Sequence, residues 1–516
     1  MGIQSISAQL NAKGISTSVY YYRAYDVEEL EPDENVKIIG FSTFSTNYEF
    51  INEVIRHLKQ RRKDIIAVVG GHFVSNNLDI FTLMPEIDYV VNGEGEVTSV
   101  DLYSRLLGYT QVDLSLIEGI AYRSGEKIVW NVNRKSICDL DNLKWPDRTL
   151  LKGGECQEAM IESARGCTGS CSFCSARRTK WRAKSVKNVA DEMEHIIKKY
   201  NVDTFSFTDS SFDNPYLNVS RIKEFCQEVI SRKLNSKFMI YLKTQVYKID
   251  DDQMWDMLIR SGLSTVLVGT ETFNEQDIAI YRKSATVQEN ILCIKKLLDM
   301  DFQLILGFIN FHPYSTYISL KENNDTLHSL NLSHKLYQLN FLQMYPKTEI
   351  YNKAVKDGLY IDKGNNIDEY TFADPIVDKL AKYLQRDVIQ NKYIKPVMAA
   401  IKDIGRLEKF LYIMKRDATF RGDEIMLNII NKAIDDKKNM CLKLDPLIYT
   451  FIDSCIELFF NKADQSQIQK NTENFINQCY ESNVIKNIEK FRLSLVKTCL
   501  NHDKHTTSKF LKIRQL

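Results

Sequence analysis

The N-terminal part of the chain alternates between two hydrophobic patterns. Short apolar runs rich in β-branched residues, which are typical of strands buried in a parallel sheet, occupy residues 16–22, 36–43, 64–71 and 88–95. Before and between them, residues 1–14 and 47–62 place apolar side chains every three or four positions, which is the period of an amphipathic helix. The alternation predicts a doubly wound, Rossmann-like α/β domain over residues 1–115.

Open sheets of this type bind ligands at the carboxyl ends of their strands. The turns at those ends are small or polar, and the residues that we select as candidate ligand contacts are Ser42, Thr43, Ser45, Gly70, Gly71 and Glu94. Because the first predicted helix starts at residue 1, we expect the sheet without the strand that usually precedes that helix. Residues 116–155 follow as a connector, with a hairpin predicted around Gly125.

A strand–helix rhythm with a period of roughly 35 residues starts at residue 159 and ends near residue 350. Its predicted strands lie at residues 159–163, 203–210, 237–244, 264–271, 301–311 and 335–344. Six such units are fewer than the eight of a closed barrel, and right-handed crossovers would curl them into a partial (β/α)6 barrel. We therefore expect an open barrel over residues 156–360, with its active face at the carboxyl ends of the strands.

The rest of the chain, residues 361–516, has the period of helices and no run typical of a strand. Its longest apolar stretch, residues 447–460, contains Asp453 and Glu457 and is too short to cross a bilayer. The N-terminus also lacks the basic region and the long apolar core of a signal peptide. We expect an α-helical C-terminal domain, and a cytoplasmic protein without a membrane partner.

Charge and cysteine usage narrow the classes of partner and compartment. A net charge of +1 gives no electrostatic basis for nucleic acid as a partner. The 11 cysteines, in a chain without a predicted signal peptide, argue against a disulfide framework and for a reducing compartment. Those that stand alone, and that we expect to be buried as small apolar residues, are Cys138, Cys156, Cys226, Cys293, Cys441, Cys455, Cys479 and Cys499.

The remaining cysteines, Cys167, Cys171 and Cys174, stand at intervals of four and three directly after the first barrel strand. A structural zinc site takes four ligands, generally as two close pairs, and a [4Fe–4S] cluster held by four cysteines carries electrons. Three cysteines would leave one iron of such a cluster open for substrate chemistry. The alternatives are a zinc site completed by Cys156 or His195, or three core cysteines that are close by chance.

The spacing, with the aromatic Phe173 just before the third cysteine, resembles the signature of the radical S-adenosylmethionine (SAM) enzymes. The resemblance implies a [4Fe–4S] cluster whose open iron binds the amino and carboxylate groups of SAM. It also implies an external one-electron reductant of the flavodoxin or ferredoxin type. Reductive cleavage of SAM would then give methionine and a 5′-deoxyadenosyl radical that abstracts hydrogen from a substrate. The partial barrel is the fold that this resemblance implies.

The resemblance also suggests which residues contact SAM, namely Phe173, Asp209, Ser211, Lys243, Gln245, Glu271 and Gly307. The family commonly binds the amino group of methionine after the second strand, here at Asp209 and Ser211, although a turn capped by Asp209 and Asp213 would use the same stretch. The polar residues after the third and fourth strands would bind the ribose and the carboxylate, or would only be hydrated at the barrel mouth. Gly307 would allow close approach of adenine, or would mark a strand kink.

The first domain, the connector and residues 344–351 are similar to the cobalamin-dependent radical SAM family, of the class B methyltransferase type, over about residues 1–355. This resemblance implies a cobalamin over the barrel mouth. The Asp-x-His-x-x-Gly motif of many cobalamin proteins is absent, and its nearest match, Asp503-Lys504-His505, lies in the C-terminal tail. Many members of the family hold cobalamin without that histidine, so a bound cobalamin and a vestigial domain both stay open. His72 is a conceivable contact, although a lone histidine after a Gly-Gly turn is more often structural.

Taken together, the patterns and the resemblance predict an oxygen-sensitive radical SAM enzyme that transfers a methyl group from cobalamin. Its substrate would be an unactivated centre of a small metabolite, a natural-product intermediate or a peptide. A radical cyclisation, rearrangement or oxidation without methylcobalamin is the first alternative. The second is a metal-stabilised binding protein without catalytic activity. No catalytic acid or base is identifiable, because radical chemistry of this class needs few such groups.

Overall fold

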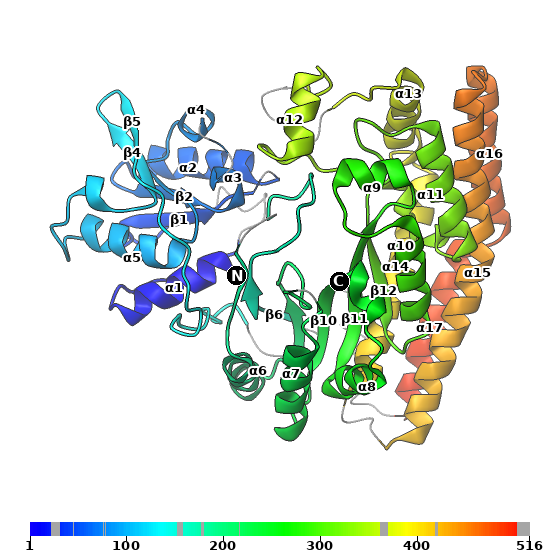
Figure 1. Cartoon of the computed structure of the whole chain (residues 1–516), viewed down its shortest axis with the longest axis horizontal. Helices are drawn as coiled ribbons and strands as arrows, with labels where there is room; N and C mark the ends of the chain where they lie inside the picture. Colours follow the sequence, from blue (N-terminus) through cyan, green and yellow to red (C-terminus); the bar gives the residue numbers. More distant parts are fainter. Residues whose placement is uncertain are drawn as a thin grey trace.

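The computed structural model describes residues 1–21, 31–44, 46–75, 77, 79–151, 158–176, 180–215, 217–361, 370–417 and 422–502. Figure 1 shows three parts side by side: an α/β domain in blue and cyan, a central layer of green strands with helices around it, and long helices in orange and red. The order of these parts in space follows their order in the sequence. The predicted fold class, a Rossmann-like domain, a partial barrel and a helical C-terminal region, is confirmed.

The first domain is built on a five-stranded sheet with the strand order β1-β2-β3-β4-β5. Strands β1 (Ile38–Ser42), β2 (Ile66–Gly70) and β3 (Tyr89–Val91) are parallel. The hairpin β4 (Ile120–Ser124) and β5 (Lys127–Trp130) turns at Gly125 and pairs antiparallel with β3. The predicted hairpin of the connector therefore extends the first sheet instead of standing apart from it.

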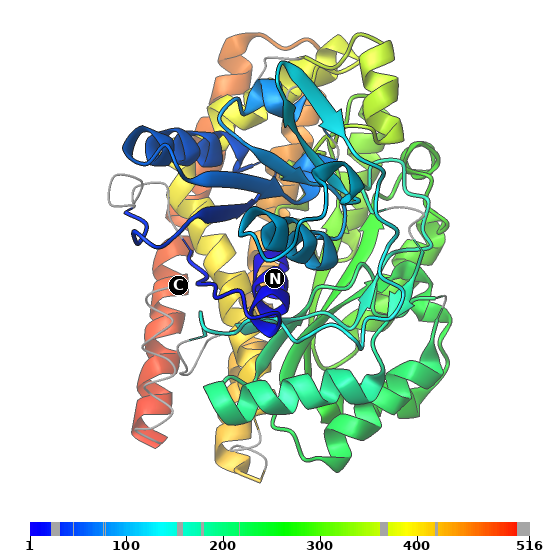
Figure 2. The ribbon, with the colours of Figure 1, turned by 90° about the vertical axis from the view of Figure 1, so that its left-hand side faces the viewer.

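Helices cover both faces of this sheet because successive side chains of each strand point to opposite faces. The helices are α1 (Gly2–Ala12), α2 (Tyr48–Arg61), α3 (His72–Ser75), α4 (Ile80–Leu83) and α5 (Gly95–Leu106), and a short turn η2 (Leu114–Leu116) precedes the hairpin. Val68 shares a core with Leu10 of α1 and Leu102 of α5, whereas its neighbour Val69 shares a core with Ile55 of α2. Figure 2 shows this domain in front of the barrel.

The prediction of a strand at residues 16–22 is wrong for the part that the structure describes. Residues 15–21 follow α1 without regular structure, and residue 22 lies outside the described residues. Asn11 explains this course, because its side chain accepts a hydrogen bond from the backbone N–H of Thr17 and donates one to the Thr17 hydroxyl. These bonds hold the segment against the end of α1, and the apolar run continues into Tyr20 and Tyr21, which are exposed.

The barrel part is a second five-stranded sheet with the order β12-β11-β10-β9-β6, and every pair in it is parallel. Its strands are β6 (Glu158–Ile161), β9 (Thr204–Phe207), β10 (Lys237–Lys243), β11 (Leu263–Glu271) and β12 (Gln303–Phe308). The helical segments between and after them are α6 (Val186–Tyr200), α7 (Val219–Ser231), η3 (Thr244–Lys248), α8 (Asp252–Ser261), α9 (Glu275–Tyr281), α10 (Val287–Leu298) and α11 (Tyr317–Ser329). Ser185 caps the start of α6, because its side chain accepts a hydrogen bond from the backbone N–H of Asn188.

The predicted sixth strand, residues 335–344, is wrong. The chain forms two short turns there, η4 (Ser333–Lys335) and η5 (Tyr337–Leu339), and pairs with the sheet only through an isolated bridge between Phe311 and Phe341. Leu336 adopts a left-handed backbone with φ of +62°, which interrupts an extended strand. The hydroxyl of Tyr337 accepts a hydrogen bond from the backbone N–H of Leu306. A side chain therefore satisfies an edge N–H of β12 that a sixth strand would have used.

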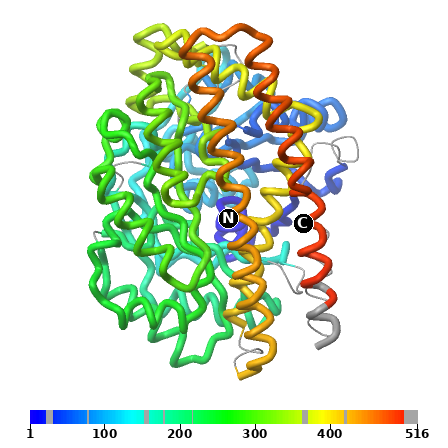
Figure 3. Tube along the Cα trace, turned by 90° about the vertical axis from the view of Figure 1, so that its right-hand side faces the viewer, coloured from blue at the N-terminus to red at the C-terminus, as the bar shows by residue number. Residues whose placement is uncertain are grey.

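The C-terminal region is helical, as predicted. Helix α12 (Glu349–Lys356) precedes it, and the region itself contains α13 (Pro375–Tyr383), a π-helical turn η6 (Leu384–Val388), α14 (Ile394–Arg416), α15 (Glu424–Phe460), α16 (Gln465–Glu481) and α17 (Val484–His502). Helix α14 packs against the barrel, where Arg416 donates a hydrogen bond to the carbonyl of Leu263. Figure 3 shows α15, α16 and α17 along one side of the molecule.

The apolar stretch at residues 447–460 forms the end of α15, and this part of the helix is amphipathic. Phe451 and Cys455 are buried. On the other face of the helix, Asp453 pairs with Lys321 of α11, and Glu457 accepts a hydrogen bond from the hydroxyl of Tyr317, which also belongs to α11. Within the part of the chain that the structure describes, no helix is long and apolar enough to cross a membrane.

Candidate active site

The three clustered cysteines lie in a loop at the carboxyl end of β6. Two short strands, β7 (Ala164–Arg165) and β8 (Arg182–Ala183), pair antiparallel on either side of this loop. The pairing closes the loop at its base, as the turn of a hairpin is closed by its strands. Cys167, Cys171 and Cys174 are all half-buried, and none of the three forms a disulfide. The strand ladder therefore brings the three thiols to the face of the barrel that the sequence predicts to be active.

Ser172 and Phe173 fix the middle of the cysteine loop to the rest of the barrel. The backbone N–H of Ser172 donates to the carbonyl of Tyr281 at 2.9 Å, and its hydroxyl donates to the neighbouring carbonyl of Ile280 at 2.6 Å. The carbonyl of Ser172 accepts from the N–H of Ile350 at 3.2 Å. The ring of Phe173 packs edge-on against Tyr281, with a centroid distance of 5.4 Å. The aromatic residue before the third cysteine thus packs at the barrel mouth and holds the loop there.

The donor set is suited to a cluster, because three thiols can bind three irons of a [4Fe–4S] cluster and leave the fourth iron open. A zinc ion would draw every sulfur to about 2.3 Å from one centre, whereas the cysteines of a [4Fe–4S] cluster bind different irons. Among the described residues, no three His, Cys, Asp or Glu side chains converge closely enough for a single ion. Burial raises the pKa of the thiols of Cys171 and Cys174, so loading the site with metal releases protons.

Of the two residues proposed to complete a zinc site, the structure places only His195. Cys156 lies outside the described residues. His195 is part of α6, where its ring packs against Trp145 at a centroid distance of 5.4 Å and against Tyr200 at 6.2 Å. The structure therefore places His195 in an aromatic contact with the connector and not beside the cysteines.

Asp209 supports the turn that leads from β6 into the cysteine loop. One carboxylate oxygen accepts from the backbone N–H groups of Ser163 and Ala164, at 2.8 and 3.1 Å, and the other accepts from the Ser163 hydroxyl. Burial raises the pKa of Asp209 to about 6, although these hydrogen bonds favour the ionised form. Both oxygens are thus engaged by Ser163 and Ala164, which lie four and three residues before Cys167.

The stretch after Asp209 contributes a second polar group to the loop. The Ser211 hydroxyl donates to a carboxylate oxygen of Asp213, so Ser211 takes part in a turn of the kind that the sequence leaves as the alternative. The ammonium group of Lys243 donates to the side-chain oxygens of Asn214 and of Thr168, which lies between the first two cysteines. The second oxygen of Asp213 and the amide nitrogen of Asn214 are buried without a hydrogen-bond partner. These unpaired groups fit a polar ligand beside the loop.

Glu271 and Lys283 form the charged pair nearest to the thiols, at 3.5 Å from each other. Both are close enough to Cys171 for their charges to act on the pKa of its thiol. Glu271 has a left-handed backbone with φ of +68°, which is rare for a residue other than glycine. Two glycines make room for its side chain: a Cβ on Gly269 would lie 2.8 Å from its carboxylate, and a Cβ on Gly307 would lie 3.5 Å from it.

Three further residues of this site were not selected from the sequence. The phenol of Tyr241 reaches across β11, where a Cβ on Gly269 would overlap it, and burial raises its pKa well above the ordinary value. Tyr241 lies two positions before Lys243, so the period of a strand would have placed both on one face. No comparable signal points to Lys283. The third residue is Ser284, which follows Lys283 in the sequence and accepts a hydrogen bond from the side chain of Gln245 at 2.8 Å.

The candidate contacts of the first domain lie at the carboxyl edge of its sheet. The hydroxyl of Thr43 donates to the carbonyl of Gly70 at 2.8 Å, and Gly71 has φ of +105° with no room for a Cβ, which would lie 2.7 Å from the carbonyl of Thr43. Ser42 lies at the end of β1 beside this turn, and Ser45 lies outside the described residues.

The same edge presents an exposed aromatic ring and open space, which leave room for a ligand. Phe44 is 46% exposed there, its ring lies 6.0 Å from that of His72, and a Cβ on Gly93 would meet only open space. Glu94 differs from the other candidates, because its carboxylate binds Arg182 at 2.8 Å, and Arg182 belongs to β8 at the base of the cysteine loop. These ion pairs keep the pKa of Glu94 low although the carboxylate is partly buried.

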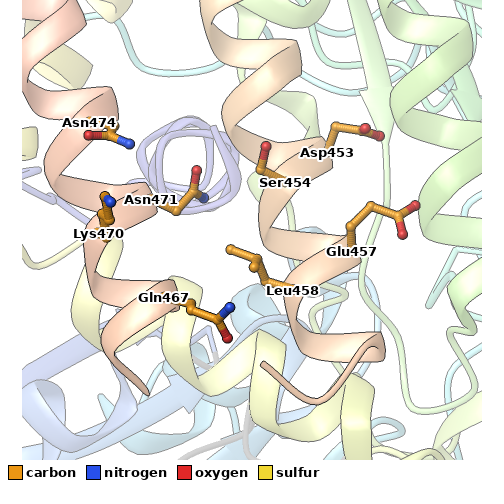
Figure 4. Close-up of a pocket in the computed structure, with 8 residues that line it drawn as sticks. All are labelled: Asp453, Ser454, Glu457, Leu458, Gln467, Lys470, Asn471 and Asn474. Carbon is orange, nitrogen blue, oxygen red and sulfur yellow. The ribbon is translucent and has the colours of Figure 1, made fainter. Parts of the chain in front are cut away.

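A groove of about 510 Å³ lies elsewhere, between α15 and α16 (Figure 4). Asp453 and Glu457 line it from α15, whereas Lys470, Asn471 and Asn474 line it from α16. It has no residue in common with the cysteine loop or with the edge of the first sheet, so its size does not make it part of the active site.

Comparison with protein-family models identifies a B12 binding domain at residues 1–103 and a domain of the Radical SAM superfamily at residues 161–325. An anaerobic magnesium-protoporphyrin IX monomethyl ester cyclase of Synechocystis sp. is 29% identical over 269 residues, which cover 50% of this chain and 52% of that protein. An uncharacterized methyltransferase of Pyrococcus horikoshii is 23% identical over 406 residues, which cover 76% of this chain and 84% of that protein. The chain spans about half the length of the first curated relatives that it matches.

Two solved structures share the fold. The cobalamin-dependent SAM radical enzyme OxsB with aqua-cobalamin bound has a TM-score of 0.63 and 17% identity, and the match covers 92% of this chain and 81% of that one. The radical SAM methyltransferase TsrM from Kitasatospora setae, with cobalamin and a [4Fe–4S] cluster bound, has a TM-score of 0.58 and 15% identity over 72% of this chain and 82% of that one. The chain therefore carries a B12 binding domain followed by a domain of the Radical SAM superfamily, and the cofactors of these two domains are cobalamin, a [4Fe–4S] cluster and SAM.

Proposed function

We propose that this enzyme transfers a methyl group from cobalamin to an unactivated centre of a small metabolite, a natural-product intermediate or a peptide. The observation that carries the proposal is the direct link between the edge of the cobalamin-type sheet and the cysteine loop, through Glu94 and Arg182. A cobalamin-dependent radical SAM methyltransferase of Streptomyces tokunonensis supports it, with 26% identity over 196 residues, or 36% of this chain and 28% of that protein.

In this proposal, the protein holds the cofactors and the substrate, and the cofactors carry the reaction. The reduced cluster supplies the electron that cleaves SAM to methionine and a 5′-deoxyadenosyl radical, and cobalamin supplies the methyl group. Cys167, Cys171 and Cys174 would bind three irons of the cluster. Lys243, held at the loop by Asn214, would bind the carboxylate or a ribose hydroxyl of SAM.

Other side chains would position SAM and exclude water. Glu271 would accept a hydrogen bond from the amino group or a ribose hydroxyl, with Lys283 limiting the free energy cost of its burial. Gly307 leaves the room beside Glu271 that a flat adenine would need. The buried cluster around Tyr281, Leu342 and Met344, against which Phe173 packs, would keep water from the radical.

The compartment and the reductant are also part of the proposal. A cluster that is reduced by one electron needs an external donor, which we expect to be a flavodoxin or a ferredoxin. The buried single cysteines, such as Cys226, Cys293 and Cys455, have free thiols, as expected of a protein in a reducing cytoplasm. We propose domain boundaries at residues 1–115, 116–155, 156–360 and 361–516.

A second candidate function is radical cyclisation or oxidation without transfer of a methyl group. The relatives named as anaerobic magnesium-protoporphyrin IX monomethyl ester cyclases favour it, because they are 26 to 29% identical over 50 to 56% of this chain. In that case cobalamin would bind but its methyl group would not be consumed.

One experiment separates the candidates without knowledge of the substrate. The full chain is reconstituted anaerobically with iron, sulfide and hydroxocobalamin, and is then supplied with a reductant and SAM carrying a deuterated methyl group. Methyl transfer predicts 5′-deoxyadenosine together with the label on cobalamin. 5′-Deoxyadenosine with unlabelled cobalamin would favour cyclisation or oxidation, and the absence of both would point to a binding protein without turnover. The variant Cys171→Ala is the control for cluster-dependent cleavage.

A further inference from the structure

Two arginines face each other across the short ladder that closes the cysteine loop. In the antiparallel pair of β7 and β8, Arg165 lies directly opposite Arg182. Like charges in directly opposed positions repel and weaken strand pairing. The two side chains are 14% and 8% exposed, so water and salt screen this repulsion only in part. The ladder therefore depends on negative charge supplied by other parts of the chain.

Two glutamates at the start of α5, directly after the turn that follows β3, supply that charge from the first domain. Glu94 binds Arg182 with both carboxylate oxygens, at 2.8 and 3.0 Å, and lies 3.5 Å from Arg165. Glu96, which is 7% exposed, binds Arg165 at 2.5 Å. Bidentate pairs of a carboxylate and a guanidinium fix orientation as well as charge. The network thus sets where the base of the cysteine loop lies relative to the first domain.

The connector and a third glutamate complete the network. The backbone N–H of Ile137 donates to Glu94 at 2.7 Å, and the carbonyl of Ile137 accepts from Arg182 at 2.6 Å. Glu162 also pairs with Arg165, at 2.8 Å, but it lies three residues away in the same segment and links no second domain. Among the described residues that pair with these two arginines, the glutamates of α5 are the ones that join the cysteine loop to the sheet edge at which the first domain would hold its ligand.

We infer that Glu94 and Glu96 are positioning residues of the cofactor site. They neutralise the opposed arginines and hold both strands at the base of the cysteine loop in a fixed position relative to the carboxyl edge of the first sheet. The cysteine loop is then ordered by the docking of the first domain, and the two cofactor sites share one ion-pair network. This inference deepens the proposed function and rests on it only for the assay that uses SAM.

The first test measures hydrogen exchange in the full chain without added cofactors. In Glu94→Gln and Glu96→Gln, amides of residues 163–176 and 180–184 should exchange about tenfold faster than in the wild type, because local opening costs less free energy. The double variant Glu94→Gln/Arg182→Gln should recover most of the protection, because it also removes the unpaired charge. Asp256→Asn, which loses an exposed pair on α8, is the matched control and should not change exchange in these segments.

The second test uses reconstituted enzyme. Glu94→Gln should raise the KM for SAM about tenfold, or by about 1.4 kcal/mol, with iron content and kcat for 5′-deoxyadenosine nearly unchanged, and the double variant should lower KM again. Unchanged exchange in both single variants, or a double variant that exchanges as fast as Glu94→Gln, would overturn the inference. The exchange experiment needs no cofactor, so an inactive wild type would refute the proposed function without affecting this result.

Discussion

Replacement of Asp209 by Asn and by Ala distinguishes a residue that positions the cysteine loop from one that binds SAM. In the folded protein its carboxylate accepts hydrogen bonds from two backbone N–H groups and from the Ser163 hydroxyl. An asparagine retains an oxygen for both N–H groups and can donate its amide to the Ser163 oxygen. An alanine leaves the two N–H groups without an acceptor, at a cost of about 1–3 kcal/mol each. We therefore expect Asp209→Ala to be less stable than Asp209→Asn by about 2–5 kcal/mol.

The wild type should differ from Asp209→Asn in a way that depends on pH. Burial raises the pKa of Asp209 from 3.8 to about 6, so the folded state binds a proton more tightly than the unfolded state does. Wild-type stability therefore rises as pH falls from 6 towards 3.8, and above pH 6 the ionised carboxylate costs about 3 kcal/mol. Asp209→Asn should be the more stable protein at pH 7.5 by up to that amount, and the difference should vanish near pH 4.

Hydrogen exchange of residues 158–165 in urea measures these local free energies without the assumption of a single unfolding transition. A second measurement, the rate of 5′-deoxyadenosine formation, should give similar KM values for SAM in the wild type and Asp209→Asn. Equal stability of Asp209→Asn and Asp209→Ala would refute the positioning role. A large rise in KM in Asp209→Asn, without loss of stability, would instead indicate that the carboxylate binds the amino group of SAM.

Three further predictions concern the loop, the barrel mouth and the support of the barrel. Cys171→Ala should lose most of its iron and all 5′-deoxyadenosine formation. Cys138→Ser should retain both in iron and product assays, because Cys138 is exposed, and not buried as the sequence led us to expect. Gly269→Ala should abolish SAM binding in calorimetry, because its methyl group would overlap the hydroxyl of Tyr241 and approach Glu271. Gly405→Ala is the control: its methyl group would meet no atom within 4 Å, and the variant should stabilise α14 by up to about 1 kcal/mol. The pKa of Glu408 is held at about 2 although the carboxylate is buried, because two lysines surround it. Its contribution to stability is therefore complete above pH 4.5 and is lost as pH falls towards 2, and Glu408→Gln should lower stability at pH 7 by about 3–5 kcal/mol in urea unfolding.

Patterns that depend on neighbours in the sequence predicted most of the fold. The runs at 36–43 and 64–71 became the parallel pair β1 and β2, because apolar β-branched runs are buried on both faces of such sheets. The run at 16–22 failed because Asn11 binds Thr17 and keeps the segment at the end of α1. The run at 335–344 failed because Leu336 takes a left-handed conformation. Both errors arise from local features, a side-chain hydrogen bond and a backbone conformation, that the spacing of hydrophobic residues does not reveal.

The candidate site was predictable to the extent that it lies at strand ends. Lys243 and Glu271 were selected because polar residues end their strands, and the structure brings both to the cysteine loop. Glu94 was selected for the same reason, yet its carboxylate binds an arginine 88 residues later in the chain. Lys283 was not selected, because it follows a helix and its relation to Glu271 exists only after folding. Pairing between distant charges is what the sequence does not reveal.

The central claim is that Cys167, Cys171 and Cys174 hold a [4Fe–4S] cluster that cleaves SAM in an enzyme that also binds cobalamin. The most direct test is anaerobic reconstitution of the full chain with iron, sulfide and cobalamin, followed by reduction in the presence of SAM. The account predicts about four irons per chain, cobalamin that remains bound through gel filtration, and 5′-deoxyadenosine in the wild type but not in Cys171→Ala. Zinc in place of iron, with no 5′-deoxyadenosine from the wild type, would contradict it.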